Sequence, residues 1–184
     1  MSCMHWRVFS LHVLLLVGIS SYALADEACD ENALGLESSD STITRLFYTG
    51  TCHYRNRAYG DAVTYWQQIP LLDPANADEQ ALSLHSLNNL GYLLFFGLGV
   101  EEDKSTALEY WQTATEQGHD EAVYHLCHAY ADVDQPTYDS YQAKPYCQKA
   151  KRIYLDKQRE DDVILEAIDG YLKQLNRHSN IRAK

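Results

Sequence analysis

Two short stretches of the sequence contain residue types that could do chemistry. His125, Cys127 and His128 stand close together in "YHLCHAY", and Cys52 is followed directly by His53. Cysteine and histidine are zinc ligands, and a cysteine beside a histidine can act as a nucleophile with its base. A closed zinc site needs four ligands, however, and the sequence has no Cys-x-x-Cys and no His-Glu-x-x-His motif. We therefore expect ordinary helix histidines, no metal and no cofactor.

Motifs of nucleophilic catalysis are also missing from the sequence. There is no Ser-x-x-Lys, no Lys-Thr-Gly and no Gly-x-Ser-x-Gly. The acidic cluster at residues 101–103 precedes an expected helix, and carboxylates at a helix N-terminus interact favourably with the helix dipole. The cluster is therefore not evidence of a catalytic pair, which would need a cleft. We expect no catalytic residue and predict that the protein is not an enzyme.

The N-terminus has the pattern of a secretory signal peptide. Arg7 precedes an apolar run at residues 13–19, and Ala-Leu-Ala at residues 23–25 supplies small residues at a cleavage site. The apolar run is shorter than the roughly 20 residues that span a bilayer. Residues 1–25 are therefore predicted to be a signal peptide, and the mature protein is predicted to be periplasmic or secreted, without stable membrane insertion.

The net charge of the chain, −11 at pH 7, excludes some classes of partner. A strongly acidic chain is repelled by nucleic acid and by anionic lipid surfaces, and the sequence has no basic run to offset this repulsion. We therefore expect no nucleic-acid partner.

An internal repeat shows how the chain is organised. The pattern of residues 62–66, "AVTYW", recurs at residues 107–111, "ALEYW", and more weakly at residues 143–147, "AKPYC". An apolar segment with helical spacing precedes each copy, so each unit is predicted to be a helix hairpin. One hairpin cannot bury its apolar face alone, whereas three stacked hairpins form a continuous core. The predicted fold is all-α, a short α-solenoid of about three helix hairpins.

These patterns also predict the domain boundaries. The apolar spacing continues in residues 161–175, where acids near the start and Lys173 near the end suit the dipole of a further helix, read as a cap on the last repeat. The predicted segments are an N-terminal arm at 26–39, a repeat domain at 40–157, and a capping helix and tail at 158–184.

The middle unit closely resembles a Sel1-like repeat, of the tetratricopeptide-like superfamily. Its matching features are the pair Leu90-Gly91, the turn Gly97-x-Gly99-Val100, the helix Ala107-x-x-Tyr110-Trp111 and the junction Gln117-Gly118-His119. The first unit is more similar to a tetratricopeptide repeat, and the third has lost its glycines and has Pro145 inside its expected second helix. The chain thus resembles Sel1-like repeat proteins of the exported type.

The cysteines fit this arrangement. Alignment of the third unit on the second places Cys127 at the position of Gly91 and Cys147 at that of Trp111. An antiparallel hairpin turning near Thr137 would bring these cysteines side by side, and exported Sel1-like proteins are similar in stapling repeats with disulfides. We predict a Cys127–Cys147 disulfide. The pairing of Cys29 with Cys52 would follow from it, since four cysteines allow three connectivities.

Solenoids usually bind partners on the concave face, which the first helix of each hairpin lines. If the inward positions of tetratricopeptide repeats carry over, the candidate partner-binding residues are Phe47, Thr51, Tyr54, Arg55, His85, Asn88, Tyr92, Tyr124 and His128. Such polar and aromatic side chains suit contacts with a peptide. The alternative is that the aromatic rings pack between repeats, as aromatic residues at helical spacing often do.

The predicted function is therefore that of an exported scaffold that binds a protein or peptide on its concave surface. A second hypothesis follows from the resemblance alone, because some exported Sel1-like proteins with disulfides have been linked to β-lactam binding or hydrolysis. Under that alternative the protein would be a cell-envelope enzyme or ligand-binding protein acting on β-lactams or peptidoglycan-related material.

Overall fold

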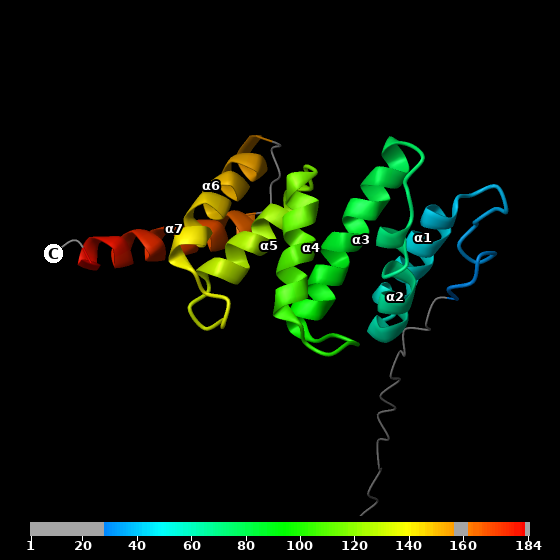
Figure 1. Ribbon diagram of the computed structural model, residues 1–184, viewed down its shortest axis with the longest axis horizontal. Coiled ribbons are helices and arrows are strands. Elements are labelled where there is room, and N and C mark those ends of the chain that lie inside the picture. Colours follow the sequence, from blue (N-terminus) through cyan, green and yellow to red (C-terminus); the bar gives the residue numbers. More distant parts are fainter. Residues whose placement is uncertain (1–27, 157–161, 183–184) are drawn as a thin grey trace, which may run out of the picture.

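The computed structural model describes residues 28–156 and 162–182, and every regular element in these two ranges is a helix (Figure 1). The predicted signal peptide lies outside the described residues. The elements are α1 (Thr42–Arg55), α2 (Tyr59–Trp66), the short 3₁₀ helix η1 (Ile69–Leu71), α3 (Ala77–Phe96), α4 (Lys104–Glu116), α5 (Asp120–Ala131), α6 (Ser140–Asp156) and α7 (Asp162–Arg182). None of the described helices is long and apolar enough to cross a membrane.

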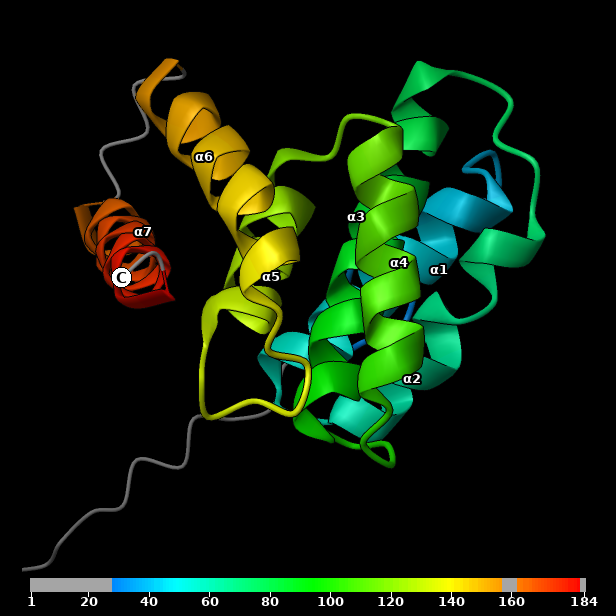
Figure 2. The ribbon, with the colours of Figure 1, turned by 60° about the vertical axis from the view of Figure 1, so that its left-hand side comes forward.

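The helices pair along the chain as α1 with α2, α3 with α4, and α5 with α6. The pairs stack in sequence order, so that α1 and α7 lie at opposite ends of the array (Figure 1). Helix α7 packs against both α5 and α6 at one end (Figure 2). The predicted all-α solenoid of three hairpins with an added C-terminal helix is thus confirmed.

Side-chain caps explain where several helices begin. The Ser41 hydroxyl, the Asn76 amide oxygen and the Asp103 carboxylate each accept a hydrogen bond from a backbone N–H in the first turn of α1, α3 and α4. Helix α6 begins upstream of Pro145, and Asp139 accepts hydrogen bonds from the first N–H groups. The proline in the third unit is therefore accommodated inside its second helix.

Each of the first two hairpins is closed by a tryptophan packed on a glycine. A Cβ atom added at Gly50 would lie 2.6 Å from the indole of Trp66, and one added at Gly91 would lie 2.6 Å from the indole of Trp111. Both indoles are fully buried, at 1% and 0% exposure. Only glycine allows the two helices of each hairpin to approach this closely.

The buried indoles also satisfy their hydrogen-bonding groups in the same way. Trp66 Nε1–H donates to the carbonyl of Phe47 at 3.1 Å, and Trp111 Nε1–H donates to that of Asn88 at 3.0 Å. In both units the accepting carbonyl lies one turn before the packing glycine. The first two units therefore have one shared closing contact, although their sequence spacings differ.

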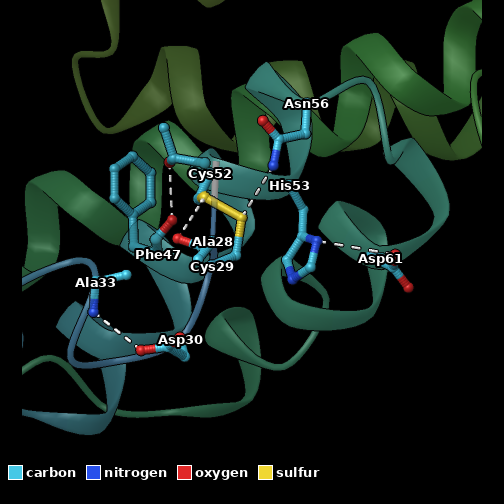
Figure 3. The surroundings of a disulfide bond; sticks show 10 residues. Ala28, Cys29, Asp30, Ala33, Phe47, Cys52, His53, Asn56 and Asp61 are labelled. Carbon is cyan, nitrogen blue, oxygen red and sulfur yellow. Dashed lines mark hydrogen bonds and ion pairs between the residues drawn. A yellow bond between two sulfur atoms is a disulfide. The ribbon is translucent and has the colours of Figure 1, made fainter. Parts of the chain in front are cut away.

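The third hairpin is closed by a disulfide at the equivalent position. Cys127 and Cys147 are bonded, with Cα atoms 4.6 Å apart and both side chains fully buried. A second disulfide, Cys29–Cys52, ties the N-terminal arm to α1 (Figure 3). These are the two pairs expected from the sequence.

Candidate functional site on the inner face

A tyrosine stands on each of the four helices α1, α3, α5 and α7. They are Tyr54, Tyr92, Tyr124 and Tyr171, here called the inner tyrosine row, and each is half-buried. Burial raises the pKa of the Tyr54 hydroxyl, and nearby Tyr92 adds to the rise. The rings of Tyr92 and Tyr124 both contact the ring of His125, with centroids 5.9 and 5.7 Å apart. These ring contacts join the tyrosines of the second and third hairpins through His125.

Two histidines connect the second and third hairpins beside this row. His119 caps α5, since its Nδ1 accepts the N–H of Ala122 at 3.3 Å. Its ring hydrogen must then be on Nε2, which donates to Nδ1 of His85 at 2.9 Å. The pair borders a cavity of about 280 Å³, whose lining residues are Ala81, Leu84, His85, Gly118, His119, Asp120 and Glu121.

Helix α7 contributes to the same face through a hydrogen bond between Tyr171 and His128. The Tyr171 hydroxyl lies 2.7 Å from Nδ1 of His128. Burial, together with nearby Tyr124 and Asp132, raises the pKa of Tyr171 to about 12, so the phenol keeps its proton. Burial also lowers the pKa of His128, so a neutral imidazole is hydrogen-bonded to the neutral phenol. Helix α7 is therefore part of the inner face as well as a cap.

Acidification is expected to destabilise the fold through His125. Its ring stacks on Trp111 with centroids 4.8 Å apart, and burial, followed by nearby His128 and His119, lowers the pKa of His125 from 6.5 to about 4. Between these values the unfolded chain binds a proton that the folded chain does not. The free energy of unfolding therefore falls as the pH drops from about 6.5 towards 4, by up to about 1.4 kcal/mol per pH unit.

Urea unfolding between pH 7.5 and 5.0 measures this dependence. His125→Gln is expected to give a shallower loss of stability with falling pH than the unchanged chain. Equal slopes for His125→Gln and the unchanged chain would show that another group causes the dependence.

Most of the candidate partner-binding residues predicted from the sequence are on or beside the inner tyrosine row. Phe47 lies 6.2 Å from His85 between ring centroids, so the first two hairpins meet there. His85 is exposed, and Phe47 and His128 are half-buried. The alternative, that these rings pack between repeats, accounts for part of the burial of Phe47 and His128, whose rings contact His85 and Phe95 of α3.

Three candidates are placed elsewhere by the structure. Asn88 is only 2% exposed, and its amide nitrogen lies 3.3 Å from the carboxylate of Glu121. Asn88 was predicted to contact a partner, but its burial on the packed side of α3 leaves little surface for such a contact. Arg55 is exposed but lines a different cavity, of about 200 Å³, between the arm and α1, together with Thr51.

The sequence-based set missed two residues of this face. Phe96 is 40% exposed, and its ring centroid is 4.9 Å from that of Tyr92 and 6.2 Å from that of His128. It follows Tyr92 by one helical turn, and that spacing could have revealed it. Tyr171 was missed because its helix was read only as a cap.

The residues of "YHLCHAY" first suggested a metal site or a nucleophile, and the bonds they make in the structure limit both possibilities. Cys127 is bonded to Cys147 and is therefore neither a free thiolate ligand nor a nucleophile. In the described parts of the chain, no group of three or more His, Cys, Asp or Glu side chains is placed to hold a metal ion. The arrangement offers aromatic faces, hydroxyls and neutral imidazoles for contact with a ligand.

Comparison with known proteins identifies one segment. Residues 84–119 match the family model of the Sel1 repeat, a range that runs from the middle of α3, through α4, to the residue that caps α5. No curated protein and no solved structure gives a significant match.

Proposed function

Because this all-helical chain contains a Sel1 repeat at residues 84–119, we propose that it is an exported scaffold that binds a protein or peptide on its inner face. Sel1 repeats typically mediate protein interactions. The observation that supports this proposal for the present chain is the inner tyrosine row, in which half-exposed rings follow one another along four helices. Tyrosine provides a large contact area at low cost in side-chain entropy, with a hydroxyl for hydrogen bonding.

Export is supported by the two disulfides together with the predicted signal peptide. Disulfides form and persist in oxidising compartments such as the periplasm or the extracellular space. Both pairs join segments of the repeat domain or its arm, so they contribute to the fold itself.

We propose that binding occurs without a catalytic step. Three histidines of the inner face are engaged in structural contacts: His119 caps α5, His128 is hydrogen-bonded to Tyr171, and His125 is stacked and buried. A general base needs to reach the proton of a bound substrate, and these contacts leave the rings committed within the protein.

The test is the selection of binding peptides from a displayed library on the purified protein, followed by affinity measurement by fluorescence anisotropy. Changing Tyr54, Tyr92 and Tyr124 together to serine is expected to weaken binding of the selected peptides at least tenfold, because aromatic contacts often dominate such interfaces. The control changes Tyr48 and Tyr65, which lie outside the row, to serine and should retain binding.

Thermal unfolding of each variant separates binding from folding. If the inner-face variant unfolds at the temperature of the control yet binds the selected peptides unchanged, the inner face is not the binding surface. Saturable hydrolysis of a chromogenic β-lactam by the purified protein would instead support the alternative of a cell-envelope enzyme.

A further inference from the structure

Helix α6 has a charge opposite to that of the rest of the protein. The helix contains four basic residues, Lys144, Lys149, Lys151 and Arg152, and one acidic residue, Asp156 at its last position. Residues 28–139, by contrast, contain eighteen Asp and Glu but four Lys and Arg. The four basic residues of α6 are not consecutive, so they form a patch only when the helix brings them together.

Three of these cations are available to a partner. Lys151 is half-buried and paired with Asp169 of α7 at 2.6 Å. Lys144, Lys149 and Arg152 are exposed, and the structure gives them no acidic partner within the described residues. Free cations next to one another on a helix repel, unless an anion lies among them.

Five exposed side chains form a stripe along the outer surface of α6, with Lys144 and Lys149 beside it. Tyr141 is 86% exposed at one end and Leu155 is 55% exposed at the other. Between Tyr141 and Leu155, at three- and four-residue spacing, the stripe contains the exposed residues Pro145, Gln148 and Arg152. At 1.5 Å per residue, the stripe is about 21 Å long.

Two open cavities lie along this stripe and share Gln148. One, of about 400 Å³, is lined by Ser140, Tyr141, Gln142, Lys144, Pro145 and Gln148. The other, of about 510 Å³, lies between α6 and α7 and is lined by Gln148, Lys151, Arg152, Leu155 and Leu172. Figure 2 shows these two helices side by side at the end of the array, away from α1 and α2. The surface is a shallow groove with cations along it and an apolar residue at each end.

We propose that this groove on α6 binds an acidic polypeptide segment that has an apolar side chain at each end. The charge complementarity favours carboxylates opposite Lys144, Lys149 and Arg152, and the length fits about seven or eight extended residues at roughly 3.3 Å each. The exposed Tyr141 and Leu155 provide the apolar contacts. This surface is distinct from the inner tyrosine row and does not depend on it.

A narrow polypeptide fits this surface better than an anionic membrane or a nucleic acid. Those partners present an extended negative surface, which would also approach the acidic remainder of the molecule and be repelled by it. A single extended segment contacts only the basic helix. Residues 28–139 contain fourteen more acidic than basic residues, so a narrow ligand that contacts α6 alone is favoured.

The experiment uses the purified full chain and a fluorescein-labelled peptide in which six glutamates separate an N-terminal leucine from a C-terminal tyrosine. A second probe has glutamine in place of every glutamate. Fluorescence anisotropy in low salt is expected to show at least tenfold tighter binding of the glutamate probe. Arg152→Glu should raise the dissociation constant at least tenfold, and Arg152→Lys should retain most of the affinity.

Arg57→Glu is the matched control, because it makes the same change of net charge on an exposed residue between α1 and α2, the hairpin at the other end of the array (Figure 1). It should leave binding of the glutamate probe within about twofold of the unchanged chain, as should the serine variant of the inner tyrosine row. Equal weakening by Arg57→Glu and Arg152→Glu would overturn the proposal, because the effect would then come from net charge alone.

Three further outcomes would also overturn it. They are equal binding of the glutamate and glutamine probes, tighter binding to phosphatidylserine-containing vesicles than to the glutamate probe, and self-association of the chain that Arg152→Glu abolishes. The last would show that a second copy occupies the groove. Circular dichroism of each variant shows that the fold is intact, which is expected because Arg152 is exposed.

Discussion

Replacement of Gly91 by alanine is expected to lower the free energy of unfolding by about 1 to 2 kcal/mol. The added Cβ would lie 2.6 Å from Nε1 and 2.8 Å from Cδ1 of Trp111, whose ring is fully buried and cannot move aside without disturbing the core. Overpacking of this kind costs about 1 to 3 kcal/mol and occasionally more. The roughly 1 kcal/mol by which alanine favours a helix over glycine offsets part of that cost.

Gly170→Ala provides the matched control for this prediction. Gly170 is also inside a long helix, α7, but a Cβ added there meets no atom within 4 Å. Only the helix propensity changes, so this variant is expected to be as stable as the unchanged chain or more stable by up to about 1 kcal/mol. Urea unfolding monitored by circular dichroism measures both variants under the same conditions.

The comparison isolates the closing contact of the second hairpin. If Gly91→Ala were as stable as Gly170→Ala, the indole of Trp111 would have room to move, and the close packing of α3 on α4 would not be essential. Gly50→Ala, which meets the indole of Trp66 at 2.6 Å, should behave like Gly91→Ala, since the first hairpin has the same contact.

Removal of the Cys127–Cys147 disulfide, by changing both residues to alanine, is expected to lower the free energy of unfolding by about 3 kcal/mol or more. A disulfide limits the conformations of the unfolded chain. By this entropy effect, closing a loop of this size raises the free energy of unfolding by about 3 kcal/mol. Both sulfurs are fully buried between α5 and α6, so their loss also leaves a small cavity in the core, at a further cost.

The Cys29–Cys52 disulfide provides a control with almost the same loop length. The sequence separations are 23 and 20 residues, so the effect on the unfolded chain is nearly equal for the two pairs. Cys29 is half-buried, at the edge of the arm. The Cys29→Ala/Cys52→Ala variant is therefore expected to lose less stability than the Cys127→Ala/Cys147→Ala variant.

Thermal and urea unfolding of both double variants decide between packing and chain entropy. An equal loss in the two would mean that chain entropy accounts for the whole effect and that burial of Cys127 and Cys147 adds nothing. A thiol count on the unfolded, unreduced protein completes the test, because free thiols from the four cysteines would contradict the two-disulfide framework.

These two predictions concern the same position in successive repeats. In the second hairpin a glycine on the first helix receives a tryptophan ring from the second helix, and in the third hairpin two bonded cysteines take both places. Each solution holds the helices of a hairpin close together, one by packing and one by a covalent bond. The alignment of Cys127 with Gly91 therefore has a physical meaning, as both sit where the helices approach most closely.

The sequence alone determined the helices, the hairpins and the cysteine pairing. Helical spacing of apolar residues, the repeated Ala-x-x-Tyr-Trp pattern and the positions of the cysteines are local properties of the chain, and each acts over one or two helices. Stacking of neighbouring hairpins follows from them, because each hairpin has an apolar face to bury. The Sel1-like resemblance of the middle unit rested on the same local features.

Only the tertiary structure decided which side chains face outwards. Asn88 was expected on the inner face and is buried against Glu121, whereas Phe96 and Tyr171 belong to that face and were not expected there. Likewise, the basic residues of α6 are scattered in the sequence and converge only on the folded helix. The reason is that exposure depends on how each helix is rotated against its neighbours, and that rotation is set by contacts between residues far apart in the chain.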